Sequence, residues 1–244
     1  MSKAERKKKF HEKIYEADAV QIHQGRFNLI DTLLNSIYDT FRRFELHRED
    51  AVARLIPGGE KLLDMGCGGG SFIFKVKDKF KEIHGIDIAS NRIHDATRLK
   101  EERHPRANIS FRVVDIDMGL PYTDGYFDAV TCIATFQLIY DPYFVIDELR
   151  RVLKKGGVLM IEVPNMAWLP RRISLLFGNL SRTSGAGGWD GGTLHYFTVS
   201  SFKAFLQEQG FKVTCVSGAG IFSSLRNWWV SLLSGDIIIK AELS

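Results

Sequence analysis

The chain has 244 residues, 45% of them hydrophobic and 25% charged, a balance that suits one α/β domain with a large core. Its formal net charge is +4, and the six basic and two acidic side chains within residues 1–13 account for the whole excess. The rest of the chain is electrically balanced, so net charge gives no support to nucleic-acid binding. We expect the basic start to be a solvated helix end or tail, with a membrane-surface or RNA contact as the minority alternative.

Cysteine usage and hydropathy indicate the compartment. Cys67, Cys132 and Cys215 lie far apart and form no C-x-x-C pair, which favours a reducing environment and gives no structural metal site. The first residues lack the uninterrupted apolar segment of a signal peptide, and the stretch 228–239 is too short and polar to span a bilayer. We therefore expect a cytoplasmic protein without stable membrane insertion.

Residues 1–54 are predicted to be helical. Apolar side chains between Phe27 and Phe44 recur at three- and four-residue spacing, the pattern of a helix with one apolar face. We expect residues 1–54 to form a helical cap and residues 55–244 to form the main domain.

The stretch 62–70 is the most informative segment of the chain. An apolar strand leads into Asp64, and glycine then occupies four of the five positions from 66 to 70. Glycine removes the Cβ atoms from a bend and admits positive φ, so a ligand can lie directly on backbone N–H groups. Residues from Ser71 onward read as a helix start, which would add its own free N–H groups. The segment predicts a nucleotide-type cofactor loop, with a purely structural tight turn as the alternative.

Four further apolar runs follow in order. The run 83–88 ends in an acid, the run 109–117 holds two acids, and the run 127–133 leads through Asp141-Pro142 to a helix ending near Arg151. A Gly156-Gly157 turn then feeds an apolar run to residue 165. Continuous apolar runs are typical of buried parallel strands. Five such strands separated by helices predict an α/β fold with a doubly wound, mostly parallel sheet.

The order and spacing of these motifs across residues 55–165 resemble the class I S-adenosylmethionine-dependent methyltransferases of small-molecule type, including the ubiquinone/menaquinone-biosynthesis-like ones. Their first motif is an apolar run, an acid and then G-x-G-x-G. The dinucleotide pattern G-x-G-x-x-G fits less well, because Ser71 stands where its third small residue belongs. The resemblance implies a seven-stranded Rossmann-like sheet, with 211–217 as the sixth strand and 237–242 as an antiparallel seventh.

The resemblance also implies a cofactor and its contacts. S-adenosylmethionine would bind and leave as S-adenosylhomocysteine, Asp87 would accept hydrogen bonds from the ribose, and Asp115 would bond the adenine amino group. The N-terminal helices would close over the cofactor or, alternatively, pack their apolar face on the sheet. Core filling is the default interpretation of Cys67 and Cys132, and Asp117 is interpreted as a solvated loop acid. The implied cofactor-binding set is Asp64, Gly66, Cys67, Gly68, Gly70, Asp87, Ile88, Asp115, Ile116 and Cys132.

The acceptor side is less defined. Residues 166–192 form a glycine-rich insertion that suits a mobile lid or, alternatively, a surface loop, and Arg171-Arg172 within it could face an anionic group. In the segment after it, His195 and Tyr196 are the catalytic candidates, although His195 could equally hold its loop by hydrogen bonds. Many relatives carry a histidine where this chain has Leu138, which weakens the case for acid–base catalysis from that segment.

Two functions stay open from the sequence. One is methyl transfer to O, N or C of a small-molecule acceptor, and the other is a non-catalytic S-adenosylmethionine-binding regulatory or partner protein. The Trp228-Trp229 pair would suit a homodimer interface.

Overall fold

The structure is a computed structural model, and it describes residues 46–180, 183, 193–220 and 226–244. The predicted helices within residues 1–45 and the glycine-rich part of the insertion lie outside the described residues. The first described helix is α3 (Arg48–Leu55), and its end coincides with the predicted boundary near residue 54, which stays a prediction.

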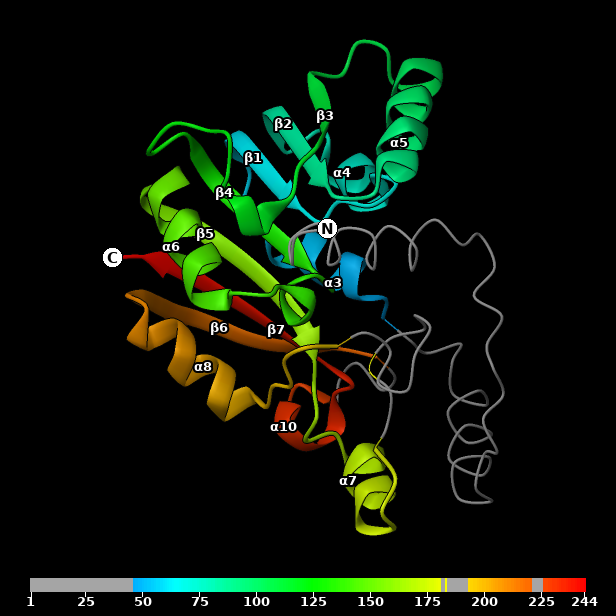
Figure 1. The fold of residues 1–244 in the computed structure, drawn as a ribbon, viewed down its shortest axis with the longest axis vertical. Coiled ribbons are helices and arrows are strands. Elements are labelled where there is room, and N and C mark those ends of the chain that lie inside the picture. Colours follow the sequence, from blue (N-terminus) through cyan, green and yellow to red (C-terminus); the bar gives the residue numbers. More distant parts are fainter. Residues whose placement is uncertain (1–45, 181–182, 184–192, 221–225) are drawn as a thin grey trace, which may run out of the picture.

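Seven strands form one sheet in the order β3-β2-β1-β4-β5-β7-β6 (Figure 1). Neighbours from β3 to β5 pair in parallel, whereas β7 runs antiparallel to both β5 and β6. The predicted doubly wound, seven-stranded sheet with an antiparallel seventh strand is confirmed. The strands are β1 (Gly59–Met65), β2 (Phe80–Asp87), β3 (Ile109–Val113), β4 (Phe127–Ile133), β5 (Leu153–Pro164), β6 (Phe211–Ala219) and β7 (Asp236–Leu243).

Helices cover both faces of the sheet, and alternate residues of each central strand serve the two faces. Along β5, Leu159 and Ile161 enter the core on the side of α6 and α8, while Met160 enters the core on the side of α3, α4 and α5. A fully buried aliphatic side chain stabilises the fold by about 1.5–3 kcal/mol, so this alternation fixes the register. The other helices are α4 (Ser71–Val76), α5 (Ser90–Arg103), α6 (Pro142–Val152), α7 (Leu169–Leu176), α8 (Val199–Glu208), α10 (Val230–Leu233) and the short 3₁₀ turns η2 (Ile116–Met118) and η3 (Phe136–Leu138).

Local sequence signals set the helix ends. Asp141 accepts hydrogen bonds from the N–H groups of Tyr143 and Phe144 at the start of α6. Thr198 and the N3 residue Ser201 form a reciprocal capping box at the start of α8. Gly210 follows that helix with φ +82°, a conformation that favours glycine. These caps place both helices where the sequence predicts them.

Two strand boundaries differ from the prediction. The third strand ends at Val113 and not at residue 117, because the Asp115 carboxylate accepts a hydrogen bond from the N–H of Asp117 and turns the chain into η2. The Gly156-Gly157 pair lies within β5 as a bulge. The pairing of β5 with β4 shifts across this bulge, since Phe127 pairs with Leu153 whereas Ala129 pairs with Val158.

No helix in the described ranges is long and apolar enough to cross a membrane.

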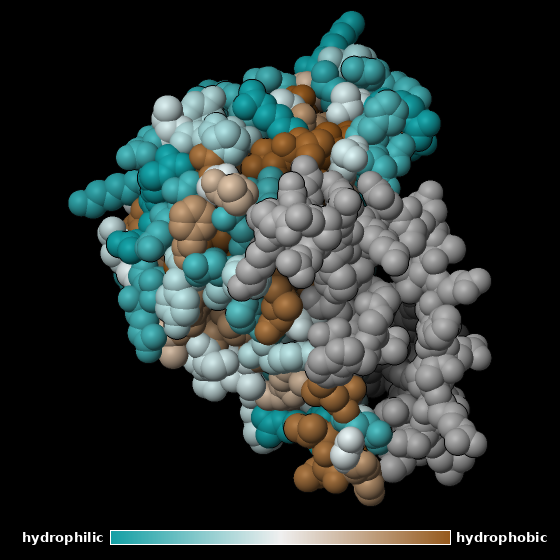
Figure 2. Space-filling view, in the orientation of Figure 1, coloured by the Kyte–Doolittle hydropathy of each residue, from teal (hydrophilic) through white to brown (hydrophobic). Residues whose placement is uncertain are grey.

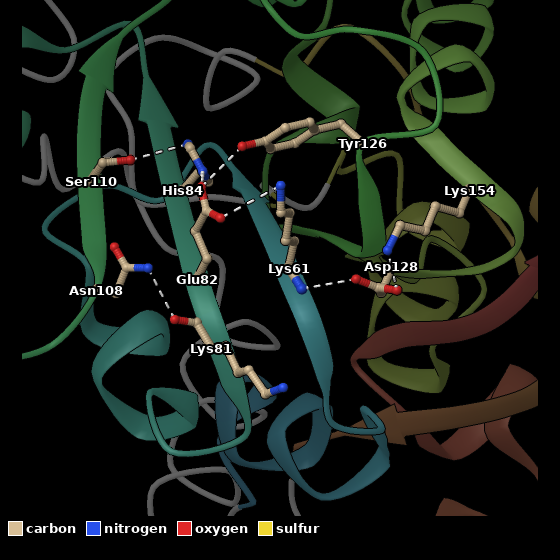
Figure 3. A network of polar contacts seen from close by, with 9 residues as sticks. All are labelled: Lys61, Lys81, Glu82, His84, Asn108, Ser110, Tyr126, Asp128 and Lys154. Atoms are coloured by element: carbon tan, nitrogen blue, oxygen red, sulfur yellow. Dashed lines mark hydrogen bonds and ion pairs between the residues drawn. The ribbon is translucent and has the colours of Figure 1, made fainter.

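A polar network crosses neighbouring strands of the sheet around Glu82 and His84 (Figure 3). The buried His84 ring lies between Glu82 Oε1 at 2.6 Å from Nε2 and Ser110 Oγ at 3.1 Å from Nδ1. Tyr126 donates to the same Glu82 oxygen, and the Lys61 ammonium lies 3.6 Å from the other. The side chains of this network come from neighbouring strands, so their contacts link β1, β2 and β3. The hydrogen bond from His84, the largest cause, lowers the pKa of Glu82 below its usual value.

Glu82→Gln is expected to lower the free energy of unfolding by about 1 kcal/mol at pH 7, the scale of lost charge-assisted hydrogen bonds. A carboxylate whose pKa is lowered by folding stabilises the protein above its unfolded pKa and loses that contribution as pH falls. The difference between variant and wild type should therefore shrink below about pH 4. Urea unfolding at several pH values measures it.

The matched control is Glu60→Gln, which removes an exposed ion pair with Lys81 on the same pair of strands. It should change stability by less than about 0.5 kcal/mol. Equal effects of the two substitutions would contradict a special role for the network.

Candidate functional site

The bend between β1 and α4 has the backbone conformation that its glycines allow. Gly66, Gly68 and Gly70 have φ values of +76°, +53° and +79°. A Cβ atom on Gly66 would lie 2.0 Å from Thr135 Oγ1, and one on Gly70 would lie 3.0 Å from the Phe111 ring. Gly66 and Gly70 are thus required by both conformation and close packing.

The N–H groups of the bend are largely used within the protein. Gly66 and Cys67 both donate to the carbonyl of Ile86, and Gly70 donates to the carbonyl of Cys67. Gly68 donates to Asp87 Oδ2 at 2.8 Å. The expectation that these N–H groups await a ligand is therefore wrong for these four residues. A ligand can still approach the backbone of the bend closely. The most accessible position is the exposed Gly69, where a Cβ atom would meet nothing within 4 Å.

The strand-ending acids meet at the same edge of the sheet. Asp87 uses its second carboxylate oxygen to accept from the N–H of Ala89 at 2.9 Å, and its carbonyl accepts from the N–H of Val114. This last bond brings Asp115 and Ile116 beside the end of β2, next to the half-buried Ile88. Asp117 is not the solvated acid that the sequence suggested, because its carboxylate accepts the N–H groups of Tyr140 and Asp141.

Asp64 is buried at the end of β1 and is 3% exposed. Its Oδ1 accepts a hydrogen bond of 2.6 Å from Thr131 Oγ1 on β4. Burial is the main cause that raises the pKa of Asp64 to about 7, and the negative charges of Glu49 and Asp87 add to it. Asp64 is therefore a carboxyl group that titrates near neutral pH, directly before the bend.

The segment 134–139 connects the bend to the second candidate region. Thr135 packs against Gly66 so closely that a Cβ atom on residue 66 would overlap the threonine side chain. The Gln137 carbonyl accepts the N–H groups of Leu194 and His195, and the His195 ring nitrogen Nε2 lies 3.0 Å from the Ile139 carbonyl. His195 thus holds its loop by hydrogen bonds, as the alternative in the sequence predicted. The neighbouring Tyr196 is 38% exposed.

Other candidates fall in less accessible positions. The Cys132 side chain is fully buried in the core, and Cys67 is 7% exposed. Burial raises the pKa of both thiols. For Cys132, this burial favours the role of a core residue over a side-chain contact with a cofactor. The Arg171 guanidinium donates to the carbonyls of Asn165 and Gly235, so it supports the backbone and is not a solvated anion site.

Several residues at this edge were missed by sequence reasoning. Thr131, Thr135 and Gln137 carry no motif, and they are found only through contacts made across strands. Glu162 did carry a signal, since it is the one charged residue in the apolar run 158–165. The described residues hold no group of three or more His, Cys, Asp or Glu side chains that could bind a metal ion.

A family model described as a methyltransferase domain matches residues 56–210. Among curated relatives, the ubiquinone biosynthesis O-methyltransferase of Acinetobacter baylyi is 30% identical over 107 residues, which cover 44% of each chain. The one of Xanthomonas axonopodis pv. citri is 31% identical over 156 residues, covering 61% of this chain and 64% of the relative. The chain spans less than half the length of the first such relatives.

Solved structures resemble this fold as well. The [4+2]-cyclase SpnF superposes with a TM-score of 0.59 at 22% identity, covering 80% of each chain. An S-adenosylmethionine-dependent methyltransferase from Aquifex aeolicus superposes with a TM-score of 0.59 at 17% identity, covering 87% of this chain and 98% of that one. At these identities, the likeness shows a shared fold.

Gly66→Ala is expected to destabilise the protein by at least about 2 kcal/mol, because the new methyl group overlaps Thr135 and left-handed backbone costs about 1–2 kcal/mol for alanine. Gly69→Ala, in the same bend but with open space around it, should change stability by less than about 0.5 kcal/mol. Urea unfolding of both variants gives the comparison. Similar losses of unfolding free energy in the two variants would show that Thr135 does not crowd residue 66.

Asp64→Asn is expected to stabilise the protein increasingly as pH rises from about 4 to about 7. Because folding raises the pKa of Asp64, the folded wild type keeps a proton that the unfolded chain has already released between these pH values. The free energy of unfolding of wild type therefore falls as pH rises over that range. The amide carries no such penalty and can still accept from Thr131. A tenfold difference between the acid dissociation constants of Asp64 in the folded and unfolded protein corresponds to about 1.4 kcal/mol. At pH 7, the free energy of unfolding of Asp64→Asn should therefore exceed that of wild type by at most about 4 kcal/mol. A pH-independent difference between the two proteins would refute the raised pKa.

Proposed function

The chain belongs to the methyltransferase domain family, and we propose that it transfers a methyl group from S-adenosylmethionine to a small-molecule acceptor. The observation that carries this proposal is the bond between Asp87 and the N–H of Gly68, which joins the strand-ending acid to the glycine bend.

The residues at this edge fit the cofactor. A carboxylate has about four lone-pair sites, and Asp87 uses two of them on the N–H groups of Gly68 and Ala89. Two sites remain for ribose hydroxyls. Asp115 likewise uses one oxygen on the N–H of Asp117, which leaves the other for the adenine amino group. Ile88 and Ile116 would lie against the adenine faces, and Asp64 would face the amino-acid part through the bend.

When bound, the cofactor supplies a methyl group on a sulfonium, which an in-line displacement transfers. The chain's own contribution is to hold the acceptor atom and that carbon within about 3–3.5 Å and aligned. His195 Nε2 is assigned as the donor to the Ile139 carbonyl from this hydrogen bond, so Nδ1 is the ring nitrogen left to accept a proton. We assign to His195 the removal of a proton from a hydroxyl or amine acceptor, and to Tyr196 contact with the acceptor.

The acceptor is proposed to be a small molecule bearing an O, N or C nucleophile. The names of the ubiquinone biosynthesis O-methyltransferase relatives favour an oxygen atom. The competing function is a cofactor-binding protein without transfer chemistry. It is motivated by Leu138 and by the fold neighbour SpnF, a [4+2]-cyclase.

One experiment separates these functions. The protein is incubated with methyl-labelled S-adenosylmethionine and panels of phenols, amines and carbon acids, while calorimetry measures S-adenosylhomocysteine binding. Binding together with labelled product supports the proposal. Binding without transfer across all panels favours the non-catalytic alternative, and absence of any binding heat overturns both.

An apolar surface supports the predicted homodimer. Figure 2 shows hydrophobic side chains gathered over α7, where Leu175, Leu176 and Phe177 are 58%, 84% and 63% exposed. Trp228 and Trp229, before α10, are 80% and 53% exposed. Patches of this kind mark contact surfaces. Sedimentation of wild type and of Trp228→Ser measures whether a dimer forms there.

Asp87→Ala is expected to weaken S-adenosylhomocysteine binding by about 2–3 kcal/mol, since the charge-assisted bonds to the ribose and the anchor of Gly68 are both lost. Asp78→Ala, an exposed acid before β2, is the control and should bind like wild type. Calorimetry measures both dissociation constants. Unchanged affinity in the Asp87 variant would remove Asp87 from the site.

A further inference from the structure

Glu162 is a fully buried carboxyl group within the apolar strand β5. Burying such a group costs several kcal/mol unless partners compensate for the lost water. Replacing a buried ionisable group by an apolar residue is often neutral or stabilising, so stability alone does not explain the carboxyl group. Burial, the largest cause, and the charge of Asp236 raise the pKa of Glu162 to about 8.

Its best contact is with a strained residue at the end of β4. Glu162 Oε2 accepts a hydrogen bond of 2.8 Å from the N–H of Ala134, which also lies 3.2 Å from the Glu162 carbonyl. Arg48 approaches Oε1 only to 3.9 Å, and that oxygen has no hydrogen-bond partner in the described part of the chain. The side chain is therefore organised around Ala134.

Ala134 is the only described residue other than glycine with positive φ, at +54°. Left-handed backbone costs an alanine about 1–2 kcal/mol and persists only where neighbours hold it. Glu162 holds its N–H, and the Gln137 side-chain amide donates to its carbonyl at 2.9 Å. Both polar groups of this one residue are thus bound by buried side chains.

The conformation of Ala134 directs the residues that follow. Thr135 is turned against Gly66, and Gln137 offers its carbonyl to the N–H groups of Leu194 and His195. We propose that Glu162 is a positioning residue of the methyl-transfer site, which fixes Ala134 in its left-handed conformation and thereby aligns the cofactor bend with the His195 segment. The inference rests on the proposed function for its chemistry, but its contacts stand independently of it.

The test compares Glu162→Leu with Glu162→Gln. The leucine variant removes the side-chain acceptor for the Ala134 N–H and leaves only the weaker bond to the backbone carbonyl of residue 162. It should remain folded, with unfolding free energy equal to or above that of wild type, because replacing a buried ionisable group by an apolar side chain is often stabilising. Its S-adenosylhomocysteine affinity should fall by about tenfold, and amide exchange should accelerate within residues 134–139 and 193–197. The glutamine variant keeps a carbonyl oxygen for Ala134 and should stay within about threefold of wild type in affinity, with protected amides.

A second substitution makes the test specific. Glycine adopts positive φ without strain and needs no holding group. Ala134→Gly in the Glu162→Leu background should therefore restore most of the affinity and the amide protection.

Wild-type affinity and amide exchange in Glu162→Leu would overturn the inference, as would failure of Ala134→Gly to restore either property. Absence of S-adenosylhomocysteine binding in wild type would overturn the proposed function instead. In that case the exchange rates of the same variants still decide whether Glu162 holds the segment.

Discussion

The site depends on the contact between Thr135 and the backbone of Gly66. A threonine side chain occupies the space that a Cβ atom would need, so β1 and β4 can bring their carboxyl ends together only if residue 66 is glycine. The contact fixes where the bend lies relative to the segment after β4. Since Gly68 is bonded to Asp87 and that segment is bonded to His195, one close approach sets the spacing between the glycine bend and the His195 segment.

Much of this arrangement could be predicted from the sequence. Parallel strands end at one edge, so acids that close successive apolar runs must gather there, and Asp64, Asp87 and Asp115 do so. Glycine spacing predicted the positive φ values of the bend, and capping residues predicted the starts of α6 and α8. These features are local, because each depends on residues within one turn or one strand.

The parts that sequence reasoning missed depend on contacts between distant segments. Nothing near Gly68 indicates that its N–H is taken by a carboxylate 19 residues later, and nothing near Asp117 indicates that it binds the N–H groups of Tyr140 and Asp141. Only the packed sheet brings these groups together. His195 illustrates the same limit, because only the packed structure shows that Nε2 is bonded to the Ile139 carbonyl and that Nδ1 is the nitrogen left for the proposed proton transfer.

The unpaired buried polar groups also bear on the role of the segment that follows β4. In the network of Figure 3, the charged and polar side chains find partners on neighbouring strands, as expected where a network serves only stability. Four buried side-chain atoms in the described residues lack a hydrogen bond, and two of them, on Gln137 and Glu162, belong to the residues that bind Ala134. Selection for stability alone would replace such groups by apolar ones. Their presence on both sides of the strained residue indicates that the conformation of the 134–139 segment, and not the stability of the sheet, is what these side chains maintain.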